Sequence, residues 1–360
     1  MSELQLALDC PGDDGFHLRV QADLPLAGVT AVHGPSGSGK TTLLHCIAGL
    51  RRASAGSRIL FADTPWQGER QYLPSWRRDI GFVFQDARLF PHLDVAGNLD
   101  FGARRRGAGP VTREAVIRWF DLESLLARSV NTLSAGQAQR VAIGRALLAA
   151  PRLLLLDEPL ANLDAASRQR CVSGLQQAVT EGGIPMLYVS HDVEEVCQLA
   201  DRMLLLEQGE VVASGSLLDL CSRIDTPLAH EERAAAVVEA ELASQDEEYG
   251  LSGLRIAGQT LWVNRLEGAP GQRRRLRIPA RDVSLCRSYP QDSSILNILP
   301  VTVAELERSG DTRVLLRLAL GDQYLLARIT RRSAAQLALA PGDALYAQVK
   351  SAALLSEDLP

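Results

Sequence analysis

Short apolar runs alternate with helix-like segments along the first half of the chain. The apolar runs are typical of strands that are buried on both faces of a sheet: Val29–His33, Asp79–Phe84, Leu153–Leu156, Met186–Ser190 and Met203–Leu206. Helical spacing follows the first run over Thr41–Leu50 and recurs over Val141–Leu148. Strands separated by helices predict a parallel sheet with crossover connections, which is an α/β fold.

The pattern changes after Asp225, where short β-like segments punctuated by glycine replace the alternation. Two stretches there resemble each other, because Leu254–Leu266 parallels Leu316–Ile329 and Ala269–Gly271 parallels Ala340–Gly342. This similarity predicts a duplicated small β module. Chance similarity between two β-rich stretches is the alternative.

The composition allows a sizeable core and more than one domain. With 360 residues, of which 46% are hydrophobic, the chain is long enough for two or three domains. We expect them to cover residues 1–230, 231–290 and 291–360. A net charge of −5 argues against a general nucleic-acid binder. Two short arginine runs, Arg104–Arg106 and Arg273–Arg275, are expected to lie on solvated faces.

The sequence predicts no membrane segment of its own. No apolar stretch approaches the ~18 residues that span a bilayer, and the N-terminus lacks the basic-then-apolar pattern of a leader. The cysteines are scattered without paired spacing, which is typical of reduced thiols in a cytosolic protein. Any membrane role is therefore expected to come through a partner.

The segment GPSGSGKT follows a predicted strand and opens a predicted helix, which is the context that phosphate-binding loops require. Its glycines let backbone N–H groups turn inward around phosphate oxygens, and the helix adds the positive end of its dipole. Lys40 brings a charge to the β and γ phosphates, and the Thr41 hydroxyl can bind Mg²⁺. The expected nucleotide-binding residues of this loop are Gly34, Pro35, Ser36, Gly37, Ser38, Gly39, Lys40, Thr41 and Thr42.

The leucine run Leu153–Leu156 ends in two carboxylates, Asp157 and Glu158. Asp157 can hold the Mg²⁺ shell, as the corresponding aspartate does in P-loop NTPases. Glu158 points to the other side of the strand end, where an attacking water could lie, and is the candidate general base. An apolar strand that ends in two carboxylates is common, but together with the upstream phosphate-binding loop it indicates a nucleotide-hydrolysing site.

The segment Leu133–Gln137 reads LSAGQ and opens a helix-like run. It resembles the signature sequence of ATP-binding cassette (ABC) proteins, although that family usually has glycine where this chain has Ala135. The resemblance implies a helix N-terminus that binds the γ-phosphate held by a second copy, so it implies a homodimer. It implies nucleotide contacts by Ser134, Gly136 and Gln137. An ordinary capped helix is the alternative, since serine is a common N-cap.

Three further residues match the ABC pattern. Gln85 resembles the Q-loop glutamine near Mg²⁺ and water, and Asp164 resembles the D-loop aspartate at the dimer seam, which also counts among the nucleotide contacts. His191 resembles the switch histidine that contacts the γ-phosphate. Phe16 is the nearest candidate for the family's adenine-stacking aromatic residue. The expected catalytic residues are thus Glu158, His191 and Gln85, and the expected metal contacts are Thr41, Gln85 and Asp157.

The C-terminal segments Ser294–Val303, Ile329–Ser333 and Val349–Ala352 resemble the small β-barrel of molybdate-binding (Mop-type) proteins. The earlier copy resembles the same accessory module in molybdate importer ATPases. The resemblance implies an ABC cassette with a helical subdomain, followed by an all-β, OB-like domain. The candidate oxyanion residues, which offer hydroxyl, N–H or cationic groups, are Ser294, Asn297, Ser333, Lys350 and Ser351. A structural or dimerising β domain is the alternative.

The segment Asp86–Gly102 resembles the stretch on which importer ATPases dock a membrane permease. The combined resemblance implies an ATPase that uses ATP and Mg²⁺ to power uptake of molybdate or the related tungstate. It implies an integral membrane permease as partner, a periplasmic molybdate-binding protein as indirect partner, no nucleic acid, and a peripheral position on the cytoplasmic face of the inner membrane.

Other functions remain open. Uptake of sulfate, sugar, polyamine or iron uses the same enzyme class, and its ATPases also carry C-terminal OB-like modules. A soluble ABC protein acting on nucleic acid or ribosomes is disfavoured by the single phosphate-binding loop and the lack of a heptad run. An oxyanion sensor with a vestigial ATPase is disfavoured by the intact set Lys40, Asp157, Glu158 and His191.

Overall fold

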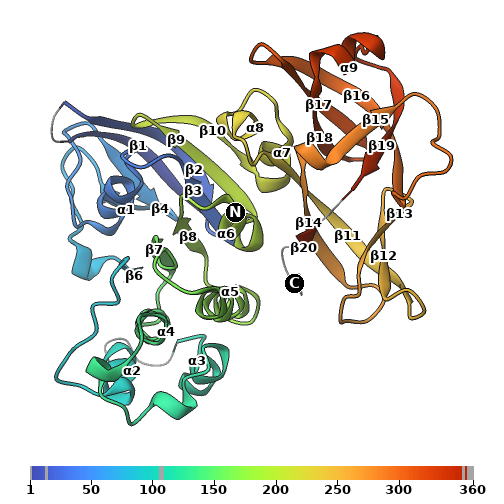
Figure 1. The fold of residues 1–360 in the computed structure, drawn as a ribbon. Coiled ribbons are helices and arrows are strands. Elements are labelled where there is room, and N and C mark those ends of the chain that lie inside the picture. Colours follow the sequence, from blue (N-terminus) through green and yellow to red (C-terminus); the bar gives the residue numbers. More distant parts are fainter. Residues whose placement is uncertain (1, 13–14, 105–108, 351–352, 355–360) are drawn as a thin grey trace. The chain divides into compact units, whose positions relative to one another are not determined.

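The computed structural model describes the whole chain except residues 1, 13–14, 105–108, 351–352 and 355–360. The chain divides into two compact units, Met1–Ser214 and Gly215–Pro360 (Figure 1). The division falls earlier than the expected boundary after residue 230. The reason is that helix α7 (Leu217–Ser222) packs on strands β11 (Ala235–Asp246) and β18 (Gln323–Thr330) of the second unit.

The first unit is built on a ten-stranded sheet with the order β5-β4-β1-β2-β10-β9-β3-β8-β7-β6. Its strands are β1 (Glu3–Pro11), β2 (His17–Pro25), β3 (Val29–His33), β4 (Arg58–Phe61), β5 (Thr64–Gln67), β6 (Ile80–Val83), β7 (Leu153–Asp157), β8 (Met186–Val189), β9 (Arg202–Glu207) and β10 (Glu210–Ser216). Strands β9, β3, β8, β7 and β6 form the parallel part that the apolar runs predict. The strands β1, β2, β4 and β5 pair in antiparallel fashion.

The helices of the first unit are α1 (Lys40–Ala48), α2 (Val95–Ala103), α3 (Arg113–Trp119), α4 (Ala135–Leu148), α5 (Ala165–Thr180) and α6 (Val193–Leu199). Helices α2, α3 and α4 gather into a group at one end of the unit (Figure 1), and α4 packs against α2, α3 and α5. This group is the helical subdomain that the ABC resemblance implies. Within the described part of the chain, no helix has both the length and the apolar character that a bilayer crossing requires.

Helix α1 is fastened at its carboxyl end by Arg78, a residue outside every motif. The Arg78 side chain is fully buried and donates hydrogen bonds to the carbonyl oxygens of Cys46, at 2.8 Å, and of Ile47. Its guanidinium also donates to the carbonyl of Leu73, at 2.9 Å. The last carbonyls of a helix have no partner within the helix, and a cation there also interacts favourably with the negative end of the helix dipole. Arg78 therefore fixes the helix that follows the phosphate-binding loop.

The second unit contains two five-stranded sheets with matching orders, β13-β12-β11-β14-β20 and β18-β17-β16-β19-β15. The remaining strands are β12 (Leu251–Ile256), β13 (Gln259–Asn264), β14 (Arg273–Pro279), β15 (Val283–Cys286), β16 (Asn297–Ser309), β17 (Arg313–Leu320), β19 (Ala344–Val349) and β20 (Ala353–Leu354). Two short helices, α8 (Pro227–His230) and α9 (Arg331–Gln336), complete the unit. Each sheet takes its last strand from the other half, since β15 follows β14 and β20 follows β19 in the chain.

The two halves repeat each other in detail, as the sequence similarity predicts. The Gly271 N–H donates to the Leu242 carbonyl at 2.8 Å, and the Gly342 N–H donates to the Val303 carbonyl at 2.8 Å. Both acceptors lie where a strand changes register, in β11 and β16 respectively. One hydrophobic core joins both sheets. The expected parts 231–290 and 291–360 are therefore interlocked halves of a single body.

Two of the three arginines of the run in β14 contradict the expectation of a solvated face, whereas Arg273 is exposed. Arg274 is 1% exposed and Arg275 is 5% exposed. Arg274 donates to the carbonyl of Glu267 at 2.9 Å, and Arg275 lies 3.2 Å from a carboxylate oxygen of Glu239. A run of charge in the sequence does not show which positions face the neighbouring strand, and here the tertiary partners decide it. The other run, Arg104–Arg106, lies largely outside the described residues.

Candidate active site

Four loops that carry predicted functional residues leave the sheet at one edge. In the parallel register, Val32 is level with Val189, Val189 with Asp157, and Leu156 with Val83. The carboxyl ends of β3, β8, β7 and β6 therefore coincide. The segments that follow them are the phosphate-binding loop, the Ser190–His191 turn, Glu158 and the Gln85 loop.

The phosphate-binding loop has the conformation that its glycines permit. Gly39 is the N-cap of α1 with a φ of 100°, a backbone conformation that favours glycine. A Cβ on Gly34 would lie 2.0 Å from the Leu206 carbonyl oxygen, so no side chain fits there. The Lys40 ammonium donates to the carbonyls of Gly34, at 2.8 Å, and Pro35, at 2.9 Å. The loop thus presents the free N–H groups of a helix start and a buried cation to one point.

Two oxygen ligands meet beside this loop. The Thr41 hydroxyl donates to Asp157 Oδ1 at 3.0 Å. Burial raises the pKa of the Asp157 carboxyl, and the hydrogen bond from Thr41 opposes that rise. Burial lowers the pKa of Lys40, against the pull of the Glu158 and Asp157 carboxylates. A hydroxyl and a carboxylate on one side of a phosphate-binding loop suit a hard cation such as Mg²⁺.

Glu158 and His191 face each other across the ends of β7 and β8. His191 Nδ1 lies 3.2 Å from Glu158 Oε1. Glu158 has a φ of 45°, which is uncommon for a residue with a side chain and is held here by an N–H bond to the Val189 carbonyl. A small cavity of about 70 Å³ opens beside them. Its lining consists of Glu158, Ala161, Arg168, Ser190, His191, Asp192 and Glu195.

Helix α4 begins with a complete capping box. The Ser134 hydroxyl accepts from the Gln137 N–H at 3.3 Å, and the Gln137 side chain accepts from the Ser134 N–H at 3.0 Å. The Ser134 hydroxyl proton is left for another acceptor, and both Ser134 and Ala135 are exposed. Gly136, in contrast, is buried, and a Cβ there would lie 2.5 Å from the Ser167 side chain. Glycine at this position therefore allows α4 to pack closely on α5.

The Q-loop and D-loop candidates lie at the surface. Gln85 is exposed, and the carbonyl of Phe84 before it accepts a hydrogen bond from Gln139 of α4 at 3.1 Å. Asp164 is exposed and caps α5 by accepting from the Ser167 N–H at 2.9 Å. The Phe16 ring lies against Gly39, since a Cβ on that glycine would be 2.9 Å from its tip.

Two residues that sequence reasoning missed also belong to this edge. His33, the last residue of β3, lies with Nδ1 3.0 Å from the Ser190 carbonyl oxygen. Burial lowers the pKa of His33 to about 4, so the ring is neutral at pH 7. Glu195 is 5% exposed and binds the Ser190 and Tyr188 hydroxyls. The sequence offered one signal for His33, because it is a polar residue at the end of an apolar strand. It offered no comparable signal for Glu195.

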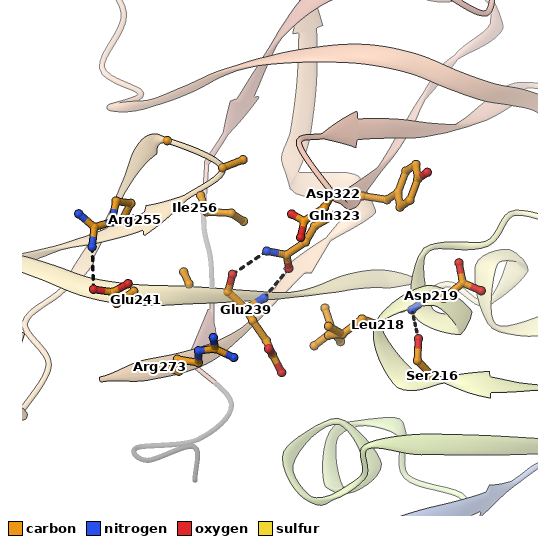
Figure 2. A pocket seen from close by; sticks show the side chains of 15 residues that line it. Ser216, Leu218, Asp219, Glu239, Glu241, Arg255, Ile256, Arg273, Asp322 and Gln323 are labelled. Carbon is orange, nitrogen blue, oxygen red and sulfur yellow. Dashed lines mark hydrogen bonds and ion pairs between the residues drawn. The ribbon is translucent and has the colours of Figure 1, made fainter. Parts of the chain in front are cut away.

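A cavity of the second unit lies away from this sheet edge and has a different character. It measures about 560 Å³ and is open to solvent, and Figure 2 shows the charged side chains around it. Arg255 binds Glu241 at 2.7 Å, and Gln323 exchanges two hydrogen bonds with the backbone of Glu239. These groups mainly hold the strands together. Of the candidate oxyanion residues that the structure describes, none lines this cavity.

The candidate oxyanion residues are not brought to one point in this chain. Asn297 is buried, and its amide is bound to the backbone of Trp262, accepting at 2.6 Å and donating at 2.9 Å. Asn297 is level with Val349, so Lys350 lies near it. Ser333 lies in the first turn of α9, where its N–H donates to the Thr330 side chain that caps the helix, at the opposite end of β16. Ser294 is exposed and precedes β16, and Ser351 lies outside the described residues.

Comparison with known proteins gives a consistent relationship for both units. Residues 18–161 match the family model of ABC transporters, and residues 293–355 match that of the TOBE domain. The chain is 47% identical to the molybdenum import ATP-binding protein ModC of Aromatoleum aromaticum, over 96% of this chain and 92% of the relative. It is 49% identical to ModC 1 of Azotobacter vinelandii, over 95% of this chain and 96% of the relative.

Two solved structures resemble the first part of the chain. One is cbiO1 from Clostridium perfringens, part of the ABC transporter complex cbiONQ, with a TM-score of 0.52 and 30% identity over 59% of this chain and 88% of that chain. The other is the dimeric structure of MJ0796, a bacterial ABC transporter cassette, with a TM-score of 0.50 and 26% identity over 60% of this chain and 99% of that chain.

Proposed function

The chain belongs to the molybdenum import ATP-binding proteins of the ABC transporter family, and from this membership we propose that it hydrolyses ATP to power molybdate uptake through a membrane permease. One observation carries the ATPase part. Lys40, Thr41, Asp157 and Glu158 meet at a single sheet edge, with Thr41 Oγ1 and Asp157 Oδ1 3.0 Å apart. The specificity for molybdate rests on the curated relatives, which are similar over both units.

Each side chain at this edge has a distinct task. The N–H groups of the loop and of the α1 start bind the β and γ phosphates, and Lys40 neutralises their charge. Thr41 and Asp157 would hold Mg²⁺, with Gln85 approaching from its loop; the ion supplies charge stabilisation at the phosphates. Glu158 accepts a proton from the attacking water.

His191 has the next task at this edge. With Nδ1 3.2 Å from Glu158 Oε1, its ring contacts the γ-phosphate and keeps the base oriented. The side of the nucleotide away from this sheet edge must be covered by another group to exclude bulk water.

A second copy of the chain completes that side of the site. Ser134 is exposed, and α4 packs on α2, α3, α5 and β6, none of which carries the phosphate-binding loop. The α4 start and the free Ser134 hydroxyl proton are thus available to the γ-phosphate bound by a partner, with Asp164 at the seam. The dimeric form of the related cassette MJ0796 supports this arrangement.

The segment after Gln85 is the proposed permease contact. Arg145 of α4 donates to the Arg88 carbonyl at 2.9 Å, and Asn98 of α2 donates to the Asp94 carbonyl at 2.9 Å. Phe101 of α2 is 41% exposed. A docked permease helix could therefore move α4 through this segment. This partner keeps the chain at the cytoplasmic face of the membrane, and a periplasmic molybdate-binding protein delivers the anion to the other side.

Reconstitution tests the whole proposal. The chain and its permease are placed in vesicles with a periplasmic binding protein loaded with molybdate, and ATP-dependent uptake of the anion is measured. We expect uptake and ATP hydrolysis to rise together with molybdate, and neither to rise with sulfate. Stimulation by a sulfate- or sugar-loaded binding protein, with none by molybdate, would refute the substrate while leaving the ATPase intact.

A further inference from the structure

A buried carboxylate binds the strand end and the turn that carry His191. Glu195 Oε2 accepts hydrogen bonds from the Tyr188 hydroxyl at 2.7 Å and from the Ser190 hydroxyl at 2.8 Å. The Ser190 hydroxyl oxygen in turn accepts from the Asp192 N–H at 3.0 Å. Ser190, directly before His191, thus binds the carboxylate, and Asp192, directly after it, is linked to the carboxylate through the Ser190 hydroxyl. The imidazole itself is 55% exposed.

The same carboxylate is joined to the loop that ends at Asp164. Arg168 Nε lies 3.3 Å from Glu195 Oε1, and another nitrogen of Arg168 donates to the Leu163 carbonyl at 3.3 Å. Arg168 also lies 4.0 Å from Asp192 Oδ2. One guanidinium thus connects the segment before the predicted dimer seam with the turn that carries the histidine.

The interactions of Glu195 with Tyr188, Ser190 and Arg168 are strong because Glu195 is buried. Glu195 is 5% exposed, and a buried carboxylate is costly unless it is paired and hydrogen-bonded. Two hydroxyl hydrogen bonds and an ion pair with the Arg168 guanidinium meet that need, and hydrogen bonds to a charged group strengthen in a low-dielectric interior. Glu195 and Arg168 also line the small cavity beside Glu158 and His191. The network therefore adjoins the reacting groups without being one of them.

We propose that Glu195, paired with Arg168, is a positioning residue for His191. It fixes the backbone on both sides of His191 so that the imidazole stays beside Glu158, and Arg168 links that position to the loop before Asp164. The inference rests on the role of His191 in the proposed function. It assigns a task to a carboxylate that neither binds phosphate nor accepts the proton of water.

The test is a double-mutant cycle measured by single-turnover ATP hydrolysis on the full chain. We expect Glu195→Ala to lower the rate by about tenfold to a hundredfold with the KM for ATP changed by less than about twofold, as for the loss of an outer hydrogen-bond partner. Glu195→Gln keeps a side-chain oxygen that can accept from both hydroxyls, and it should recover part of the rate. In a His191→Ala background, Glu195→Ala should cause almost no further loss, because the positioned group is gone.

The control variant is Glu181→Ala, which removes a similar ion pair with Arg118, at 3.3 Å, from the exposed end of α5. It should keep the rate of the unchanged chain. If Glu195→Ala does not fold, Tyr188→Phe removes one hydrogen bond of the network and Ser190→Ala removes two, and both variants enter the same cycle. An equal loss from these changes with and without His191 would overturn the inference. Full activity of His191→Ala would remove the histidine's role in the proposed function as well, whereas a sensitive His191 with an insensitive Glu195 would remove only the inference.

Discussion

In the first unit, functional residues that are far apart in the chain meet at one edge, whereas in the second unit the candidate ligands separate to opposite ends. The first unit's central strands are parallel, so every loop that follows a strand emerges on the same side. The second unit's strands are antiparallel, so Ser333 after β18 and Lys350 after β19 lie at opposite ends of β16. A residue that directly follows a strand can therefore be assigned to the site in the parallel sheet of the first unit, but not in the antiparallel sheets of the second unit.

The two units also use buried polar groups differently. In the cassette, His33 and Glu195 surround the turn beside Glu158. In the β unit, Asn297 binds the backbone of Trp262 and so joins β16 to β13, strands of different sheets. The buried polar groups thus support the candidate active site in the first unit and join the two sheets in the second unit.

The largest expected effect tests the chemical role of the sheet edge. Glu158→Gln removes the proposed base but leaves Lys40 and Thr41 in place. We expect kcat to fall by about a hundredfold to ten-thousandfold with ATP binding retained. Phosphate release and binding of a fluorescent ATP analogue measure the two quantities. Glu181→Gln, on the exposed end of α5, is the control, and an unchanged kcat in Glu158→Gln would exclude this residue as the base.

A smaller effect, on stability, tests the buried histidine of the cassette. The pKa of His33 is about 4 in the folded chain and 6.5 in its ordinary state, so the unfolded chain binds more protons between these values. The stability from the neutral ring is present above pH 6.5 and is lost as the pH falls towards 4, by about 3 kcal/mol at most.

Urea unfolding of the cassette transition at pH 7.5 and pH 4.5 measures this loss. His33→Gln keeps a donor for the Ser190 carbonyl and should flatten the pH dependence in this window. The same slope in the variant and in the unchanged chain would show that His33 is not the titrating group.

The smallest effect tests the cohesive role assigned to Asn297. Asn297→Ala leaves the N–H and carbonyl of Trp262 without their side-chain partner, and we expect the second unit to lose about 2 kcal/mol with ATP hydrolysis unchanged. Asn264→Ala, at the exposed end of β13, should change stability by less than about 0.5 kcal/mol. Calorimetric titration of the chain with molybdate adds a second readout. Loss of molybdate binding at unchanged stability would make Asn297 a ligand and remove the contrast between the units.

Much of the cassette was predictable because its signals are local. The run Val29–His33 is β3 as predicted. The family, the fold class and the ATPase activity are confirmed by the relatives. The predicted roles of the individual site residues stay predictions, since their tests are chemical.

Other features depended on partners that no local pattern names. Strand β18 ends at Thr330 and helix α9 begins at Arg331, within the segment Ile329–Ser333 that resembles the Mop-type barrel. The Thr330 side chain caps that helix by accepting from the Ser333 N–H. Arg274 reads as a surface charge and is buried, because the carbonyl of Glu267 and neighbouring groups receive its guanidinium. In each case the deciding contact comes from outside the apolar pattern.

The sequence by itself determined the phosphate-binding loop, the carboxylates at the end of a leucine strand and the duplication of the β module, because each is set by neighbouring residues and by backbone preference. Only the tertiary structure decided which polar groups became buried supports, as for Glu195, Arg78 and Asn297, and that β15 and β20 exchange between the two halves. A buried polar group is acceptable only where a partner from a distant segment satisfies it, and that partner exists only after the chain has folded.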